Sequence, residues 1–356
     1  MSELTPPFPS AAEIERPERE ERPQQVWIIA PPRPRWWLHI VLLMLTFLTT
    51  TLVGTHMQFN FVNHLAVFGF DDLSSFLTSV AHQPSLLVHG LPFSLTLMFI
   101  LLAHEMGHYL YARHYHVYAT LPFFIPFPSL FGTLGAFIRI KSPIPSRDAL
   151  FDIGVAGPIA GFVPACAAVA VGILLSQPLA HVGGEESGIR LGLLPLVFHI
   201  AARIWHIHTP LASLSLHPVA AAGWVGMFAT AMNLLPGGQL DGGHILYSAF
   251  PKLHRWISLL TVAGLILLHY YFWFGWLLWA VVLWLTSYHP RVPSPSPISS
   301  SRKAIAVLGV VMLALSFTPE PVAEGSGREV WSQIREGARD ELLYLRDAAH
   351  RGLHHQ

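Results

Sequence analysis

The stretch LLAHEMGHYL, residues 101–110, places two histidines and a glutamate within an apolar run that is otherwise suited to lipid. His104 and His108 are four residues apart, so on a helix they project from one face, a turn apart, and can share a metal ion. Glu105 directly follows His104, where a carboxylate can act on water at the metal without being a ligand. Burying one ionisable side chain near mid-bilayer costs about 2.5–3.5 kcal/mol. Three such groups in five residues therefore indicate a shared function, and binding of one metal ion explains their presence.

A purely structural role is the alternative, with both histidines hydrogen-bonded in a protein core and Glu105 paired to a neighbour. The H-E-x-x-H pattern arises by chance in roughly one chain in twenty of this length and histidine content, so the motif alone is only moderately specific. Its position within an apolar segment favours the metal site.

The composition is that of a membrane protein. Hydrophobic residues make up 52% of the 356 residues and charged residues 12%, and the mean hydropathy is +0.47. Basic and acidic residues both number 21, so the net charge gives no reason to expect a nucleic acid partner. Cys166 is the only cysteine, which excludes an internal disulfide and a zinc site built from cysteines.

Apolar runs of the length needed for a crossing recur along the chain, and they predict an all-α polytopic membrane protein with six to eight transmembrane helices. The run at 257–286 is either one tilted helix or a hairpin that bends near Phe274 and Gly275. The run at 191–205 either crosses the membrane or lies in its interface, and the run at 304–317 is short. The clearest runs are 37–55, 86–111, 153–176 and 219–235.

Arginine and lysine predict the orientation of the early helices. The tail before the first helix is rich in arginine, whereas residues 56–85 contain neither Lys nor Arg. Basic residues return after the second helix, at Arg113, Arg139 and Lys141. The first helix therefore runs outward from the cytosol, and the H-E-x-x-H residues lie in the cytosolic half of the second.

The loop from Tyr118 to Ala149 is more than a linker. It contains the apolar, proline-rich stretch LPFFIPFPSL and then GTLGAFIRIKS, which alternates in the manner of a strand. A small membrane-associated β-hairpin or a re-entrant loop fits this pattern. We expect three parts in the chain: a disordered cytosolic tail without a secretory signal at 1–35, a transmembrane domain at 36–317, and an amphipathic tail at 318–356.

Two histidines leave a zinc ion short of ligands, so a third protein ligand is needed. The second polar stretch in apolar sequence is AMNLLPGGQLDGGHIL, residues 231–246, in which Asp241 is flanked by glycines that let the backbone approach another segment closely. A surface turn is its alternative reading. Asp148 and Asp152 compete as ligands, although they fit a helix start, with Ser146 or Asp148 as the cap and Asp152 in the first turn.

Asp241 is the preferred third ligand. It reaches the depth of His104 only if residues 191–205 do not cross the membrane, and Lys252 and Arg255 favour that topology because they place the end of the next helix in the cytosol.

LLAHEMGHYL followed by NLLPGGQLDGG resembles the site-2 protease family of intramembrane zinc metalloproteases, the peptidase M50-like proteins, whose core is three helices bearing H-E-x-x-H and N-x-x-P…L-D-G. FGTLGAFIRIKSPIPSRDALFDIGVAGPIAGF, residues 131–162, is similar to the subgroup that includes bacterial forms and chloroplast relatives. The resemblance covers about residues 85–320, with the core at 85–246. It implies one zinc ion per chain held by His104, His108 and Asp241, with Glu105 as general base and Asn233 near the scissile bond.

The resemblance also implies a multi-pass protein of a bacterial cell membrane that cleaves membrane-protein substrates in or near a transmembrane helix, with its active site toward the cytosol. For Asn233 the alternative role is a hydrogen bond at the end of its helix. For His244 we favour a ring that is hydrogen-bonded at the membrane interface over one that supports the metal site. Gly157 and Gly161 are interpreted as a packing face. Neither gap between the motifs holds a PDZ-sized domain, so substrate choice by such a module is not expected. A metal carrier or sensor, or an inactive zinc-binding scaffold, is the alternative function, which the 21 histidines support.

Overall fold

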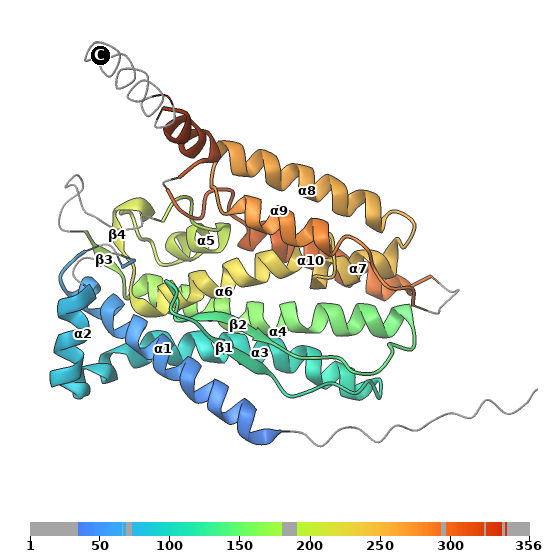
Figure 1. The fold of residues 1–356 in the computed structure, drawn as a ribbon, viewed down its shortest axis with the longest axis horizontal. Helices are drawn as coiled ribbons and strands as arrows, with labels where there is room; N and C mark the ends of the chain where they lie inside the picture. The colour runs from blue at the N-terminus through green and yellow to red at the C-terminus, as the bar shows by residue number, and fades with distance from the viewer. Residues whose placement is uncertain are drawn as a thin grey trace, which may run out of the picture. The chain divides into compact units, whose positions relative to one another are not determined.

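Three long apolar helices, α1, α3 and α4, form the framework of the computed structural model (Figure 1). The structure describes residues 35–336 and 339, except for 66, 69–72, 180–190, 293–296 and 324. Within this part, three segments are long and apolar enough to cross a membrane, and they overlap the first three expected runs. The helices are α1 Trp36–Val62, α3 Leu91–His114, which continues from the 3₁₀ helix η1 Pro84–Gly90, and α4 Arg147–Leu174.

The remaining helices are shorter. The run at 257–286 is a helical hairpin that turns at residues 272–275, as one of the two alternatives predicts, and not one tilted helix. The run at 191–205 holds a helix of nine residues, about 14 Å long, which is too short to cross a bilayer. These helices are α2 Leu73–His82, α5 Leu196–Ile204, α6 Pro218–Leu234, α7 Asp241–Ala249, α8 His254–Tyr271, α9 Trp276–Leu285 and α10 Ser300–Ser316.

The loop between α3 and α4 forms a β-hairpin, which is one of the two expected alternatives. Strand β1, Phe123–Pro126, pairs antiparallel with β2, Thr133–Phe137, and the register shifts between Phe124 and Pro126. The hairpin lies along α1 and α3 (Figure 1). Its turn is fixed to α1 because the Thr49 hydroxyl donates a hydrogen bond to the Gly132 carbonyl at 2.6 Å. A second pair of short strands, β3 Gln177–Pro178 and β4 Leu214–Ser215, ties the end of α4 to the segment before α6.

Helix α4 is the centre of the bundle, where it packs against both α3 and α6. The Ser146 side chain caps its start by accepting a hydrogen bond from the Ala149 backbone, as one alternative predicts. Asp148 occupies the first turn. The expectation that Asp152 lies in that turn is wrong by one turn, because the helix begins at Arg147.

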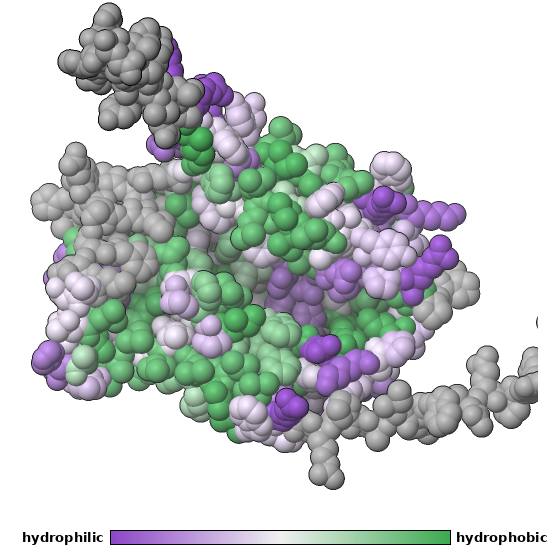
Figure 2. Space-filling view, viewed as in Figure 1, coloured by the Kyte–Doolittle hydropathy of each residue, from purple (hydrophilic) through white to green (hydrophobic). Residues whose placement is uncertain are grey.

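The surface of the bundle suits a lipid environment. Large apolar side chains are exposed along its helices, for example Phe99 of α3, Val163 of α4 and Leu260 of α8. Figure 2 shows this hydrophobic surface over much of the bundle, with hydrophilic residues gathered toward one end. That end is where α3 ends, α4 begins and α6 passes into α7, and it is called the α7 end below; the opposite end, beside α2, is called the α2 end (Figure 1).

The two tails are largely outside the described residues. The predicted disordered tail falls almost wholly on residues 1–34, which lie outside the described residues. The part of the predicted amphipathic tail after residue 336 also lies outside them, apart from residue 339. Residues 327–336 are helical, and the Trp331 indole there donates a hydrogen bond to the His269 ring of α8 at 3.2 Å.

Candidate metal centre

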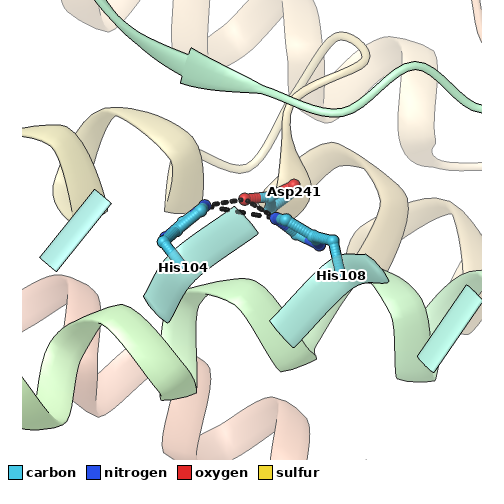
Figure 3. Close-up of side chains that lie close together, drawn as sticks. All are labelled: His104, His108 and Asp241. Carbon is cyan, nitrogen blue, oxygen red and sulfur yellow. Dashed lines mark hydrogen bonds and ion pairs between the residues drawn. The ribbon is translucent and has the colours of Figure 1, made fainter. Parts of the chain in front are cut away.

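Helix α3 carries His104, Glu105 and His108, all of which are buried. The spacing of four residues puts the two imidazoles on one face, as expected, and their Nε2 atoms lie 3.2 Å apart. Asp241 lies opposite this pair, with its Oδ2 atom 3.2 Å from each Nε2 atom (Figure 3). Within the described part of the chain, His104, His108 and Asp241 are the one group of three or more potential ligands whose donor atoms converge in this way.

Asp241 reaches the histidines because the chain turns tightly between α6 and α7. Gly238 adopts a left-handed conformation with φ +61° in this turn. A Cβ added to Gly242 would stand 2.2 Å from the Leu234 carbonyl oxygen, and one added to Gly243 would stand 2.3 Å from that of Gly238. The close backbone approach expected of the glycines beside Asp241 is therefore present, and it places the start of α7 against the end of α6.

Hydrogen bonding shows that the ligand atoms of His108 and Asp241 fit a metal ion. His108 Nδ1 lies 2.7 Å from the Ile153 carbonyl oxygen, and because a carbonyl only accepts, this nitrogen carries the proton. In the neutral ring Nε2 is then a bare lone pair facing His104 and Asp241. Asp241 Oδ2 is itself buried without a hydrogen-bond partner among the described residues.

The separations agree with this conclusion. Ligand bonds of about 2.0–2.1 Å in a tetrahedral site place neighbouring ligand atoms about 3.3 Å apart. The three observed separations are all 3.2 Å. Two imidazole nitrogens and one carboxylate oxygen are also a donor set that zinc accepts, with a fourth position left for water or substrate.

Two glycines of α4 form the surface on which the histidines lie. A Cβ added to Gly157 would stand 2.0 Å from His108 Nε2, and one added to Gly161 would stand 2.9 Å from His104 Cβ. The sequence pattern predicts a packing face here, and the face packs against the metal centre itself. The same helix supplies the Ile153 carbonyl that holds His108 in its tautomer.

Glu105 and Asn233 lie beside the three ligands. The Asn233 amide nitrogen is 3.2 Å from His104 Nε2, and the Glu105 carboxylate is within hydrogen-bonding reach of the Ile138 backbone, just after β2. Both side chains line a cleft of about 250 Å³. Its other walls include Thr133–Ala136 of β2, Phe228 of α6 and Trp279 of α9. The cleft therefore leads from the hairpin to the metal centre.

The competing carboxylates have another partner. Arg302, at the start of α10, contacts Asp152 through Nε at 2.9 Å and Nη2 at 2.7 Å, and its Nη1 lies 3.1 Å from Asp148. Tyr115 donates a hydrogen bond to Asp152 and accepts one from Arg302. Burial beside the Asp152 carboxylate raises the pKa of Tyr115.

His244 also has a partner that the sequence does not reveal. Its Nδ1 atom lies 2.9 Å from Nε2 of His289, and the Tyr247 ring stacks on His289 with centroids 4.0 Å apart. This contact agrees with the favoured reading of a satisfied histidine. His289 and Arg302 stand in no recognisable motif, so no local signal in the sequence could identify their contacts.

A buried His–His–Asp centre between apolar helices is the arrangement of a membrane-embedded metalloprotein. The sequence model of peptidase family M50 matches residues 92–274, which contain the whole centre. The chain belongs to this family.

Curated plant proteins are similar to the chain over most of its length. The probable chloroplastic zinc metalloprotease EGY1 of Oryza sativa subsp. japonica is 32% identical over 246 residues, or 67% of this chain and 42% of that protein. EGY1 of Arabidopsis thaliana is 32% identical over 253 residues, or 69% and 44% of the two chains. The probable chloroplastic zinc metalloprotease EGY2 of Arabidopsis thaliana is 29% identical over 254 residues, or 69% and 44%. The alignments thus span less than half the length of these relatives.

Proposed function

We propose that the chain is a zinc metalloendopeptidase of the site-2 protease type, which hydrolyses peptide bonds in or near transmembrane segments of membrane-protein substrates. The observation that carries the proposal is the convergence of His104, His108 and Asp241 on one point, with Glu105 beside them in a cleft. Names of the M50 relatives support zinc as the metal and proteolysis as the activity.

In this proposal His104, His108 and Asp241 hold one zinc ion per chain. The chemistry that zinc supplies in such a centre is polarisation of a carbonyl oxygen and acidification of water. Glu105 takes the proton from the attacking water and returns it to the leaving amine. The Asn233 amide, at the wall of the same cleft, holds the scissile carbonyl in place. Ile153 keeps His108 in the tautomer that a ligand requires.

The substrate reaches this centre as an extended strand, because a helix hides its peptide bonds in its own hydrogen bonds. Strand β2 lines the cleft and pairs with β1 on one side. An unwound substrate segment adds to the other edge of β2 and so presents a peptide bond to Glu105. The apolar cleft walls, such as Phe228 and Trp279, suit the side chains of a former transmembrane helix.

In this proposal the protein lies in a bacterial cell membrane, and the charges support a metal centre in the half of that membrane that faces the cytosol. Arg113, Lys141, Lys252 and Arg255 belong to the α7 end, where α3 and α6 end and α8 begins. In the proposed topology α6, α8 and α10 cross the membrane in addition to α1, α3 and α4. The shorter α9 carries the chain back from the end of α8 toward the start of α10. This arrangement lies within the expected six to eight crossings.

The experiment is Glu105→Gln in the full chain, with metal content and cleavage of a single-span model substrate measured on the same preparation. We expect zinc to stay near one per chain and cleavage to fall about 10²–10⁴-fold, because general base catalysis is lost while the ligands remain. Glu336→Gln, an exposed glutamate of the last described helix, is the matched control and should leave both unchanged. A wild-type chain that holds zinc but cleaves nothing would favour the carrier or scaffold function.

A further inference from the structure

A cavity of about 500 Å³ lies outside the metal centre, between α1, α2 and the turn of the hairpin. Its wall is apolar, with Leu52 and Met57 from α1, Leu77 from α2, and Pro128 and Leu130 from the turn. The cleft at the metal centre has its own lining, so this cavity is a separate feature.

The cavity continues into a second one of about 690 Å³ toward the α2 end of the bundle. The two share His56 and Phe76, so together they form one groove along α1. The second section is also largely apolar, with Phe59, Val62 and Leu86, but its lining adds the amides of Gln58, Asn63 and Gln83 and the rings of His56 and His89. No Lys, Arg, Asp or Glu occurs among the described residues that line either section. The groove is thus apolar along its length and gains hydrogen-bonding side chains toward its outer end.

The dimensions of the groove favour an acyl chain over a helix as its occupant. It follows α1 from Thr49 to Val62, fourteen residues or about 21 Å, which is close to the hydrocarbon depth of one leaflet plus part of the interface. A helix with its side chains is about 10–12 Å wide, so one turn of it takes up about 400–600 Å³, as much as the whole inner section. A single acyl chain is thinner and fits along this length.

We propose that the groove is a binding site for an acyl lipid of the surrounding leaflet, with an uncharged or zwitterionic headgroup such as that of a phosphatidylethanolamine. The headgroup takes hydrogen bonds from the amide side chains of the outer section, and one acyl chain runs inward along α1 to Pro128 and Leu130 of the hairpin turn. There it lies beside the contact between Thr49 and Gly132 that fixes the turn to α1. The bound lipid therefore forms part of the support of the hairpin.

The proposal is tested by photo-crosslinking in bilayers of phosphatidylcholine that contain a phosphatidylethanolamine with a diazirine in its acyl chain. Adducts on the full-length chain are mapped by peptide mass spectrometry. We expect them to concentrate on residues 49–57 and 128–130. Leu52→Trp fills the groove from α1 and Leu77→Trp fills it from α2, and each should reduce these adducts at least about tenfold, equivalent to 1.4 kcal/mol of binding. Leu77→Trp keeps the test decisive if Leu52→Trp does not fold.

The matched control is Leu48→Trp, one turn earlier on α1, where the side chain is exposed and does not line the groove. This variant should keep the adducts. Native mass spectrometry should find one lipid retained per wild-type chain and none in Leu52→Trp. Equal labelling in all three variants would mean that only the ordinary lipid annulus contacts α1, and a retained polypeptide in place of a lipid would also overturn the proposal. A strong, salt-sensitive preference for phosphatidylglycerol would contradict the uncharged headgroup site.

Discussion

The imidazole of His108 lies directly on the α-carbon of Gly157, so closely that a Cβ at residue 157 would stand 2.0 Å from Nε2. No real Cβ atom tolerates that distance, so any larger residue must push the ring away from its place. The contact makes α4 a structural part of the metal centre, although it supplies none of the three proposed ligand atoms.

Gly157→Ala should therefore remove the metal without unfolding the bundle. We expect zinc content and cleavage both to fall by more than tenfold, because displacing a ligand or its support costs about 10–100-fold in metal affinity. Gly161→Ala should have a smaller effect, since its nearest contact is 2.9 Å. Gly264→Ala in α8 is the control, because a Cβ there meets nothing within 4 Å. Normal zinc binding by Gly157→Ala would show that the two histidines are not held as described.

Asp241→Ala should lower zinc affinity by at least about 100-fold, because it removes one of three protein ligands and leaves two imidazoles. The matched variant is Asp148→Ala, which deletes the competing carboxylate that contacts Arg302. Zinc titration of both proteins, monitored by metal analysis after gel filtration, checks the assignment. If Asp148→Ala lost the metal and Asp241→Ala kept it, the third ligand would be wrongly assigned.

The sequence was sufficient for the parts of the site that depend on local geometry. A spacing of four residues brings His104 and His108 together on any α-helix. The glycines beside Asp241 predict a tight approach, and the structure shows it. Asp241 itself could be placed only through the basic residues that decide the topology of residues 191–205, since a ligand more than a hundred residues away has no local signal.

Contacts between distant segments could not be predicted. Arg302 and Asp152 are 150 residues apart, and neither belongs to a sequence motif that predicts their contact. A small-x-x-x-small pattern predicts a close packing face but not what packs there, so the role of Gly157 emerges only from coordinates. Only the place of Asp152 in α4 was wrong by a turn, because Ser146 and Asp148 are both acceptable caps and the sequence does not decide between them.

Leu134→Pro should reduce cleavage by at least about tenfold and leave zinc content unchanged. Proline removes a backbone donor from β2, whose residues line the cleft, and strand addition by a substrate depends on such backbone groups. Leu134→Ala keeps the backbone N–H and removes only the exposed side chain, so it should cleave nearly as well as wild type. Comparable cleavage by the proline and alanine variants would argue against substrate addition to β2.

The contact of Arg302 with Asp152 should be measurable as a coupling free energy. The two side chains are 21% and 15% exposed and make two parallel hydrogen bonds, a geometry in which arginine gains from its planar fork. Arg302 Nη2 also donates a hydrogen bond to the Tyr115 hydroxyl at 3.2 Å, which adds a further contact to the pair.

Thermal unfolding of Arg302→Ala, Asp152→Asn and the double variant in detergent should give a coupling of about 1–3 kcal/mol. Arg302→Ala should lower the unfolding temperature more than Asp152→Asn does, because it leaves the Asp148 and Asp152 carboxylates without their arginine, whereas Asp152→Asn leaves Arg302 in contact with Asp148. Lys303→Ala, which changes the exposed neighbour of Arg302, is the control and should shift the unfolding temperature little. Because Asp152 directly precedes the Ile153 carbonyl that bonds His108, Arg302→Ala should also weaken zinc binding, by less than Gly157→Ala does. Additive single effects would show that the contact between Arg302 and Asp152 contributes nothing to holding α10 against α4.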